Sequence, residues 1–82
     1  MKILFFASLR EQLNTEEEQW KELNGALTAG DVLSQLQKRG EPWASSLNAE
    51  RLLVSVNQEI SNLRTKITVD DELAFFPPVT GG

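Results

Sequence analysis

The chain closes on residues 70–82, which read Asp-Asp-Glu-Leu-Ala-Phe-Phe-Pro-Pro-Val-Thr-Gly-Gly, and this stretch decides how the rest of the fold is read. The paired aspartates predict a turn. Residues 72–76 then alternate as a final strand does, with Leu73 and Phe75 on one face and Phe76 on the other. If the first face is buried in the core, Phe76 is exposed beside the end of the chain.

The end of the chain, residues 78–82, is expected to project as a tail from a single domain of residues 1–77. Pro77 and Pro78 have a fixed φ and no backbone N–H, so they should leave the sheet as a stiff, extended stem. The last five residues reach at most about 17 Å, and glycines without side chains could thread a channel too narrow for any other residue. A frayed terminus is the alternative. The residues expected to enter a partner protein are Pro78, Val79, Thr80 and Gly81, ahead of the terminal carboxylate of Gly82.

Composition removes most catalytic chemistry from the chain. The 82 residues include no cysteine and no histidine, so there is no thiol nucleophile and no thiolate or imidazole metal ligand. No serine stands in a nucleophile-elbow pattern. The acidic run at residues 70–72 is explained better as a turn than as a metal cluster, because it lacks calcium-loop spacing. We therefore expect no metal site, and the terminal carboxylate is the one unusual chemical group.

The balance of charge is acidic, with 12 Asp and Glu against 8 Lys and Arg and a net charge of −4. This balance argues against nucleic acid or an anionic membrane as a partner and favours a basic protein surface. The opening apolar run, residues 1–7, is too short for a transmembrane helix and lacks a signal-peptide cleavage site. We therefore expect a cytoplasmic protein with neither a nucleic-acid nor a membrane partner.

Strands are predicted on both sides of one main helix. Residues 28–40 give the helix, with Thr28 as N-cap, Asp31 reaching back toward it and Gly40 as the left-handed stop. Residues 2–9 predict the first strand, and residues 10–14 a short turn or single helical turn. The residues of this strand expected to face the core are Ile3, Phe5, Ala7 and Leu9; those expected to face away are Lys2, Leu4, Phe6 and Ser8.

The remaining segments complete an α+β fold. Residues 15–23 fit neither period, and Thr15 followed by Glu18 resembles a helix capping box, so strand and helix both stay open there. Pro42 predicts the start of a helical turn. Residues 51–57 predict a strand, residues 57–58 a turn, and Ile60 the centre of a short strand. The residues that share one face of the longer strand are Leu52, Val54 and Val56.

Four stretches together resemble a known family: Val56–Glu59, Asp70–Gly82, Ile3–Ala7 and Leu9–Glu11. They are similar to the small, sulfur-carrying subunit of molybdopterin synthase, over essentially the whole chain and most specifically in its last thirteen residues. The resemblance implies a β-grasp, ubiquitin-like fold, in which a mixed sheet of about five strands packs on the main helix. It also implies that residues 15–23 form the second strand.

The resemblance further implies a cycle of chemistry at Gly82. In this family an adenylating enzyme uses ATP and Mg²⁺ to activate the terminal carboxylate, and a sulfur donor converts it to a thiocarboxylate. The tail then enters the large subunit of the synthase, where sulfur passes to the cyclic pyranopterin precursor of molybdopterin. The implied assembly is a heterotetramer of two small and two large subunits. On this reading the chain is a sulfur-donating co-substrate without a permanently bound cofactor.

An apolar docking patch near the tail is the remaining expectation. Phe6 and Phe76 are predicted on outward faces, and Ile60 stands alone among polar residues. We expect Phe6, Ile60 and Phe76 to form a landing patch for the adenylating enzyme and the large subunit. The alternative is that one or more of them fills the core.

Other functions stay open on the sequence. A carrier could deliver sulfur to the thiamine thiazole or to a tRNA base. A ubiquitin-like modifier would end in an isopeptide bond to a lysine. A plain interaction module would use the tail for no chemistry at all.

Overall fold

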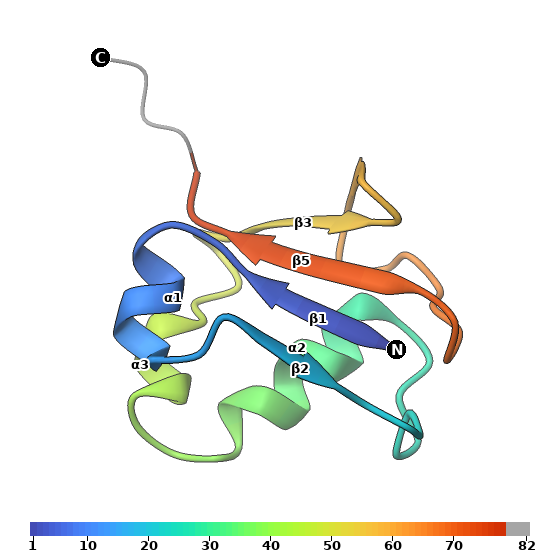
Figure 1. Ribbon diagram of the computed structural model, residues 1–82, viewed down its shortest axis with the longest axis horizontal. Coiled ribbons are helices and arrows are strands. Elements are labelled where there is room, and N and C mark those ends of the chain that lie inside the picture. Colours follow the sequence, from blue (N-terminus) through green and yellow to red (C-terminus); the bar gives the residue numbers. More distant parts are fainter. Residues whose placement is uncertain (79–82) are drawn as a thin grey trace.

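The computed structural model describes residues 1–78, in which a mixed five-stranded sheet of order β2-β1-β5-β3-β4 packs against the main helix (Figure 1). The strands are β1 (Lys2–Phe5), β2 (Glu17–Gln19), β3 (Leu53–Val56), β4 (Glu59–Ser61) and β5 (Glu72–Phe76). The helices are α1 (Ser8–Leu13), α2 (Ala29–Gln37) and α3 (Trp43–Ser46). The predicted α+β, β-grasp arrangement is confirmed.

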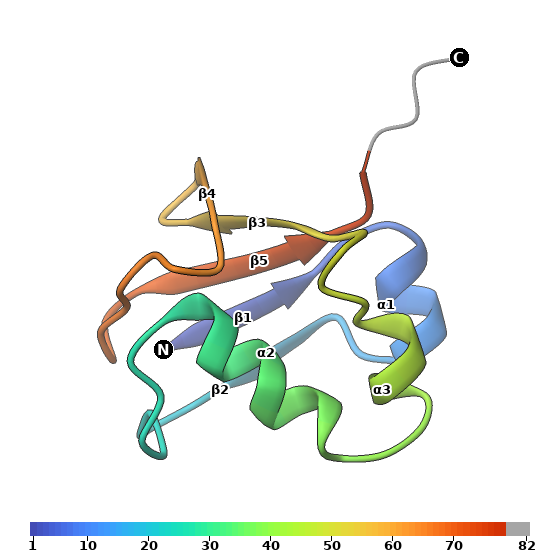
Figure 2. The same ribbon diagram turned by 180° about the vertical axis from the view of Figure 1, so that it is seen from behind.

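The sheet is built around its last strand. β5 lies between β1, to which it is parallel, and β3, to which it is antiparallel. β2 and β4 are the edge strands, each antiparallel to its neighbour. Seen from behind, α2 crosses one face of the sheet, while α1 and α3 lie at the end from which the chain leaves (Figure 2).

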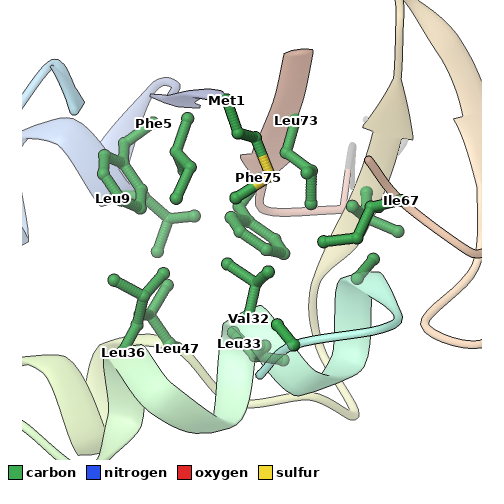
Figure 3. Close-up of a cluster of buried hydrophobic side chains, with 14 of the residues drawn as sticks. Met1, Phe5, Leu9, Val32, Leu33, Leu36, Leu47, Ile67, Leu73 and Phe75 are labelled. Atoms are coloured by element: carbon green, nitrogen blue, oxygen red, sulfur yellow. The ribbon is translucent and has the colours of Figure 1, made fainter. Parts of the chain in front are cut away.

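The core fills the space between the sheet and α2. Ile3, Phe5, Leu73 and Phe75 are at most 1% exposed, as the alternation of the two central strands predicts. They meet the buried face of α2, which carries Val32, Leu33 and Leu36 (Figure 3). Each such side chain contributes about 1.5–3 kcal/mol on full burial, so this layer provides most of the stability.

Helix α2 begins as predicted and ends earlier. The Thr28 hydroxyl accepts from the backbone N–H of Asp31 at 3.2 Å, and the Asp31 carboxylate accepts from the N–H of Thr28 at 3.1 Å, which completes the capping box. The helix ends at Gln37, because Arg39 and Gly40 donate to carbonyls three residues back and close tighter turns. Gly40 has a φ of +91°, the left-handed conformation expected of a stop.

The first strand is shorter than the predicted 2–9. β1 ends at Phe5, and Ser8 begins α1. The burial of Leu9 is confirmed, but Leu9 reaches the core from a helix, together with Leu13 one turn later. The prediction that Ala7 faces the core is wrong: Ala7 is exposed and has a φ of +54°, since the chain turns sharply there to start the helix.

The ambiguous segment 15–23 contains strand β2, as the family resemblance implied. Glu18 does not cap a helix. Its carboxylate accepts two hydrogen bonds from the Arg39 guanidinium, at 2.6 and 2.9 Å, and one from the indole of Trp20 at 3.1 Å. Arg39 also lies 4.6 Å over the ring of Trp43. This network connects the edge strand to the end of α2, and both tryptophans pack against the core.

The hairpin of β3 and β4 follows its predicted turn. Asn57 and Gln58 both have positive φ, at 53° and 69°, as a two-residue hairpin turn requires. The Asn57 side chain donates to Asp71 and accepts from the N–H of Glu72, both at 3.0 Å, so the turn is attached to β5. The hydrogen bond from the Asn57 side chain to the Asp71 carboxylate is the main reason why the pKa of Asp71 lies below its ordinary value. Val54 is buried, and Leu52 and Val56 pack against the core, as predicted.

Candidate functional site

The stem of the tail continues the central strand of the sheet. β5 ends at Phe76, Pro77 is half-buried, and Pro78 is exposed. The N–H of Phe6 donates to the carbonyl of Phe75 at 3.1 Å, so the stem begins beside the point where β1 turns into α1. The predicted insertion residues Val79, Thr80 and Gly81, and the predicted reaction site Gly82, lie outside the described residues.

The face of the sheet opposite α2 carries apolar side chains in register. Leu4, Ala74, Ser55 and Ile60 stand opposite one another across β1, β5, β3 and β4. The two central positions hold small residues, 5% and 9% exposed, whereas Ile60 on the edge strand is 70% exposed. The surface is therefore recessed over β5 and β3, where the side chains are small, and an apolar side chain projects from it at β4.

The next row toward the tail is aromatic. The rings of Phe6 and Phe76 meet edge to face, with centroids 6.4 Å apart, and Leu53 pairs with Phe76 from β3. Phe6 is 45% and Leu53 is 38% exposed, while Phe76 is half-buried because Phe6 packs against its ring. We call these three residues, Phe6, Leu53 and Phe76, the tail-side patch.

The structure thus places the three predicted docking residues on one face of the sheet. Phe6 and Phe76 touch, whereas Ile60 lies about 12 Å from Phe76, two strand spacings across and two residues along. None of the three belongs to the buried core, so the alternative that they fill it is wrong. Leu53 is the residue that the sequence reasoning missed. The sequence does indicate the outward position of Leu53, because Leu53 stands between Leu52 and Val54, which face inward.

Among residues 1–78 this arrangement offers a partly exposed apolar surface beside the stem of the tail. Within residues 1–78 no cluster of three or more His, Cys, Asp or Glu side chains could hold a metal ion. The turn at residues 70–71 instead uses Asp71 as an acceptor for Asn57 and for the N–H of Thr68. No helix of this part of the chain is long and apolar enough to cross a membrane.

Comparison with known proteins places the chain. The molybdopterin synthase sulfur carrier subunit of Haemophilus influenzae is 39% identical over 82 residues, which cover 100% of this chain and 99% of that protein. The protein of the same name from Escherichia coli is 37% identical over 83 residues, with the same two coverages. Among solved structures, SAMP1 from Haloferax volcanii matches with a TM-score of 0.70 at 30% identity, covering 100% of this chain and 98% of that one.

The family itself follows from a match that reaches the end of the chain. The model of the ThiS family covers residues 3–82, so it includes both the sheet and the tail. The full-length relatives agree with this match and with the resemblance that the sequence carries. On these grounds the chain belongs to the ThiS family.

Proposed function

We propose that this chain is the sulfur carrier subunit of a molybdopterin synthase. The observation that carries the proposal is its full-length match, at 39% and 37% identity, to proteins named as that subunit. The chain has no cysteine to hold sulfur, and in this proposal the terminal carboxylate of Gly82 carries it. In the same proposal the cycle runs in the cytoplasm.

The chemistry at Gly82 needs activation, because a carboxylate would have to expel oxide to act as an acyl donor. In the proposed cycle a carboxylate oxygen attacks the α-phosphorus of ATP, which an adenylating partner binds with Mg²⁺, and pyrophosphate leaves. A sulfur donor at the oxidation level of sulfide then attacks the acyl carbon. AMP leaves with the bonding electron pair, and a thiocarboxylate remains at Gly82.

The loaded tail next acts as a nucleophile in the large subunit of the synthase. The sulfur attacks a carbon of the cyclic pyranopterin precursor and displaces an oxygen substituent, which leaves with the bonding electron pair. Water then attacks the acyl carbon, the bond from that carbon to sulfur breaks with its electron pair on sulfur, and the carboxylate of Gly82 is restored. Two such deliveries supply the two sulfur atoms of the dithiolene. The proposed assembly has two small and two large subunits, and it needs no permanently bound cofactor on this chain.

The tail-side patch and Ile60 are the proposed landing surface for both partners. An aromatic pair that is partly exposed beside a projecting tail gives a partner an apolar anchor close to the reacting end. Pro78, Val79, Thr80 and Gly81 would then enter the partner as far as Gly82. The basic groups that orient the tail and the substrate would belong to the partners, since this chain is acidic overall.

A ubiquitin-like modifier is the second candidate. The structure of small archaeal modifier protein 1 from H. volcanii matches this fold with a TM-score of 0.69 at 28% identity. A modifier would form an isopeptide bond from Gly82 to a lysine, which produces conjugates of higher mass on a denaturing gel. Sulfur delivery to a thiamine or tRNA product is a variant of the carrier function. Identification of the molecule that accepts the sulfur distinguishes this variant from molybdopterin synthesis.

The deciding experiment is the intact mass of the chain after incubation with ATP, Mg²⁺, the adenylating partner and a sulfur source. The proposal predicts a mass gain that corresponds to one oxygen replaced by sulfur, mapped to Gly82. A matched chain extended by one alanine after Gly82 has no glycine carboxylate and should gain nothing. No gain in the parent chain, with a partner shown to be active on another carrier, would refute the carrier function.

A further inference from the structure

A hollow of about 460 Å³ opens at the root of the tail, on the side away from the tail-side patch. It lies among α1, α3, the loop that leads into β3, and the stem, which the two ribbon views place at one end of the molecule (Figures 1 and 2). Its lining includes two apolar residues, the buried Leu9 and the half-buried Leu52, and the two prolines of the stem. Any protein that receives the tail must therefore pass close to this hollow.

The rest of the lining is polar and rich in hydrogen-bond donors. It includes Ser8, Ser46, Gln12, Asn48 and Arg51, whose side chains carry hydroxyls, amides and a guanidinium. A guanidinium is always charged and has five N–H donors in a fork that fits a carboxylate. The hollow thus combines a cation, neutral donors and an apolar lining.

The backbone at Arg51 is held by its own loop. Its backbone N–H donates to the carbonyl of Asn48 at 2.9 Å, and the N–H of Glu50 donates to the Asn48 side chain at 3.0 Å. The ion pairs within residues 1–78 are Lys2–Glu17 and Arg39–Glu18, so Arg51 has no carboxylate partner in that part of the chain. A cation beside the stem that pairs with no carboxylate of residues 1–78 is a candidate site for an anionic group.

The charge of the whole molecule sharpens this conclusion. The chain carries a net charge of −4, so the surface that complements it is basic on average. Arg51 would repel such a surface at the root of the tail unless the partner placed an acidic side chain there. One such carboxylate would also fix the orientation of the docked chain, because a charge pair in the wrong place costs affinity.

We propose that this hollow receives an Asp or Glu side chain of the large synthase subunit when that subunit takes up the tail. The carboxylate would pair with Arg51, and its methylene groups would contact Leu52 and the prolines of the stem. The inference rests on the proposed function and adds to it a second docking point, opposite the tail-side patch.

The test is the affinity of the purified large subunit for the chain, measured by calorimetry at low and at physiological salt. Arg51→Glu should weaken binding at least 10-fold, and Arg51→Gln should weaken it less and reduce its dependence on salt. Arg64→Glu is the matched control, because Arg64 is an exposed residue outside the lining of the hollow and the change in charge is identical. Its affinity should stay within about 2-fold of the parent chain.

A second variant tests the hollow itself. Gln12 is an exposed residue of α1, so Gln12→Trp should fill the space without a loss of fold, which a thermal melt checks. This variant should also bind the large subunit at least 10-fold more weakly. Arg51→Glu and Gln12→Trp should still gain sulfur at Gly82, because the proposed Asp or Glu side chain belongs to the large subunit and not to the adenylating partner.

Three outcomes would overturn the inference. One is binding of Arg51→Glu within 2-fold of the parent; another is an equal loss in Arg64→Glu, which would indicate general charge repulsion. A third is a loss of sulfur loading with intact binding to the large subunit, which would assign the acid to the adenylating enzyme. If the parent chain loads sulfur but never binds the large subunit, the proposed function fails as well, and the parent titration alone reveals it.

Discussion

Replacement of Gly30 by alanine tests how closely α2 approaches the loop that precedes β5. The N–H of Gly30 donates to the carbonyl of Leu63 at 2.8 Å, and the N–H of Ala29 donates to that of Thr65 at 3.0 Å. A Cβ at position 30 would lie 2.9 Å from the Leu63 oxygen and 3.3 Å from its Cβ. The obstacle is backbone, so it cannot turn aside as a flexible side chain can.

Two effects of opposite sign compete in this variant. Alanine improves helix propensity by up to about 1 kcal/mol over glycine. Overpacking against a fixed neighbour costs about 1–3 kcal/mol, and a stretched hydrogen bond costs about 1 kcal/mol more. We therefore expect Gly30→Ala to lower the free energy of unfolding by about 1–3 kcal/mol. For a domain of this size each kcal/mol lowers Tm by roughly 4–8 °C.

The assay is thermal and urea unfolding of the variant beside Ser34→Ala. Ser34 is an exposed residue in the middle of the same helix, so its replacement has the propensity gain without the contact. Ser34→Ala should be as stable as the parent or slightly more stable. A Gly30→Ala chain that is at least as stable as Ser34→Ala would refute the close approach.

Three further predictions concern the tail-side patch, the edge strand and the turn after β1. Phe76→Ala should weaken binding of the large subunit by about 2 kcal/mol, near 30-fold, and an unchanged affinity would refute the anchor role of Phe76. The hydrogen bonds from Arg39 hold the pKa of Glu18 below its ordinary value of 4.5. The stability that Glu18 adds, about 1 kcal/mol, is therefore full above that pH and is lost as the pH falls through the lowered pKa, so urea unfolding of parent and Glu18→Gln should converge in acid. Ala7→Gly should raise Tm, because φ +54° and ψ −133° are strained for alanine and relaxed for glycine; a lower Tm would contradict this reading.

Local patterns predicted the elements whose cause is local. The capping box of α2 needs only Thr28 and Asp31, three residues apart, and the turn at Asn57 needs only residues that tolerate positive φ. The alternation of β5 likewise assigns its buried and outward faces without knowledge of its neighbours. These parts of the fold could be predicted from the sequence.

Other parts depend on contacts between distant residues. The segment around β2 resembled a helix start because Glu18 follows Thr15 by three residues, yet Glu18 binds Arg39, which is 21 residues away. The end of β1 was missed because Leu9 fits both a continued strand and a helix that also buries Leu13. Only the packing of α1 against the core favours the helix over a continued strand, and this packing requires a strained backbone at Ala7.

The central position of β5 explains how the chain could serve both partners of the proposed cycle. Neighbours on both sides hold the strand, so the direction of the stem is set by the core. Phe76 belongs to the proposed landing surface and directly precedes the stem, so docking there would fix the origin from which the tail extends. From Phe76 the chain can reach about 20 Å to Gly82. A partner that contacts Phe76 must therefore hold its reaction centre within that distance of Phe76. The same limit applies to every partner, whatever reaction it catalyses. In the proposed cycle the body of the protein sets position and reach, and the reactions themselves are left to the partners.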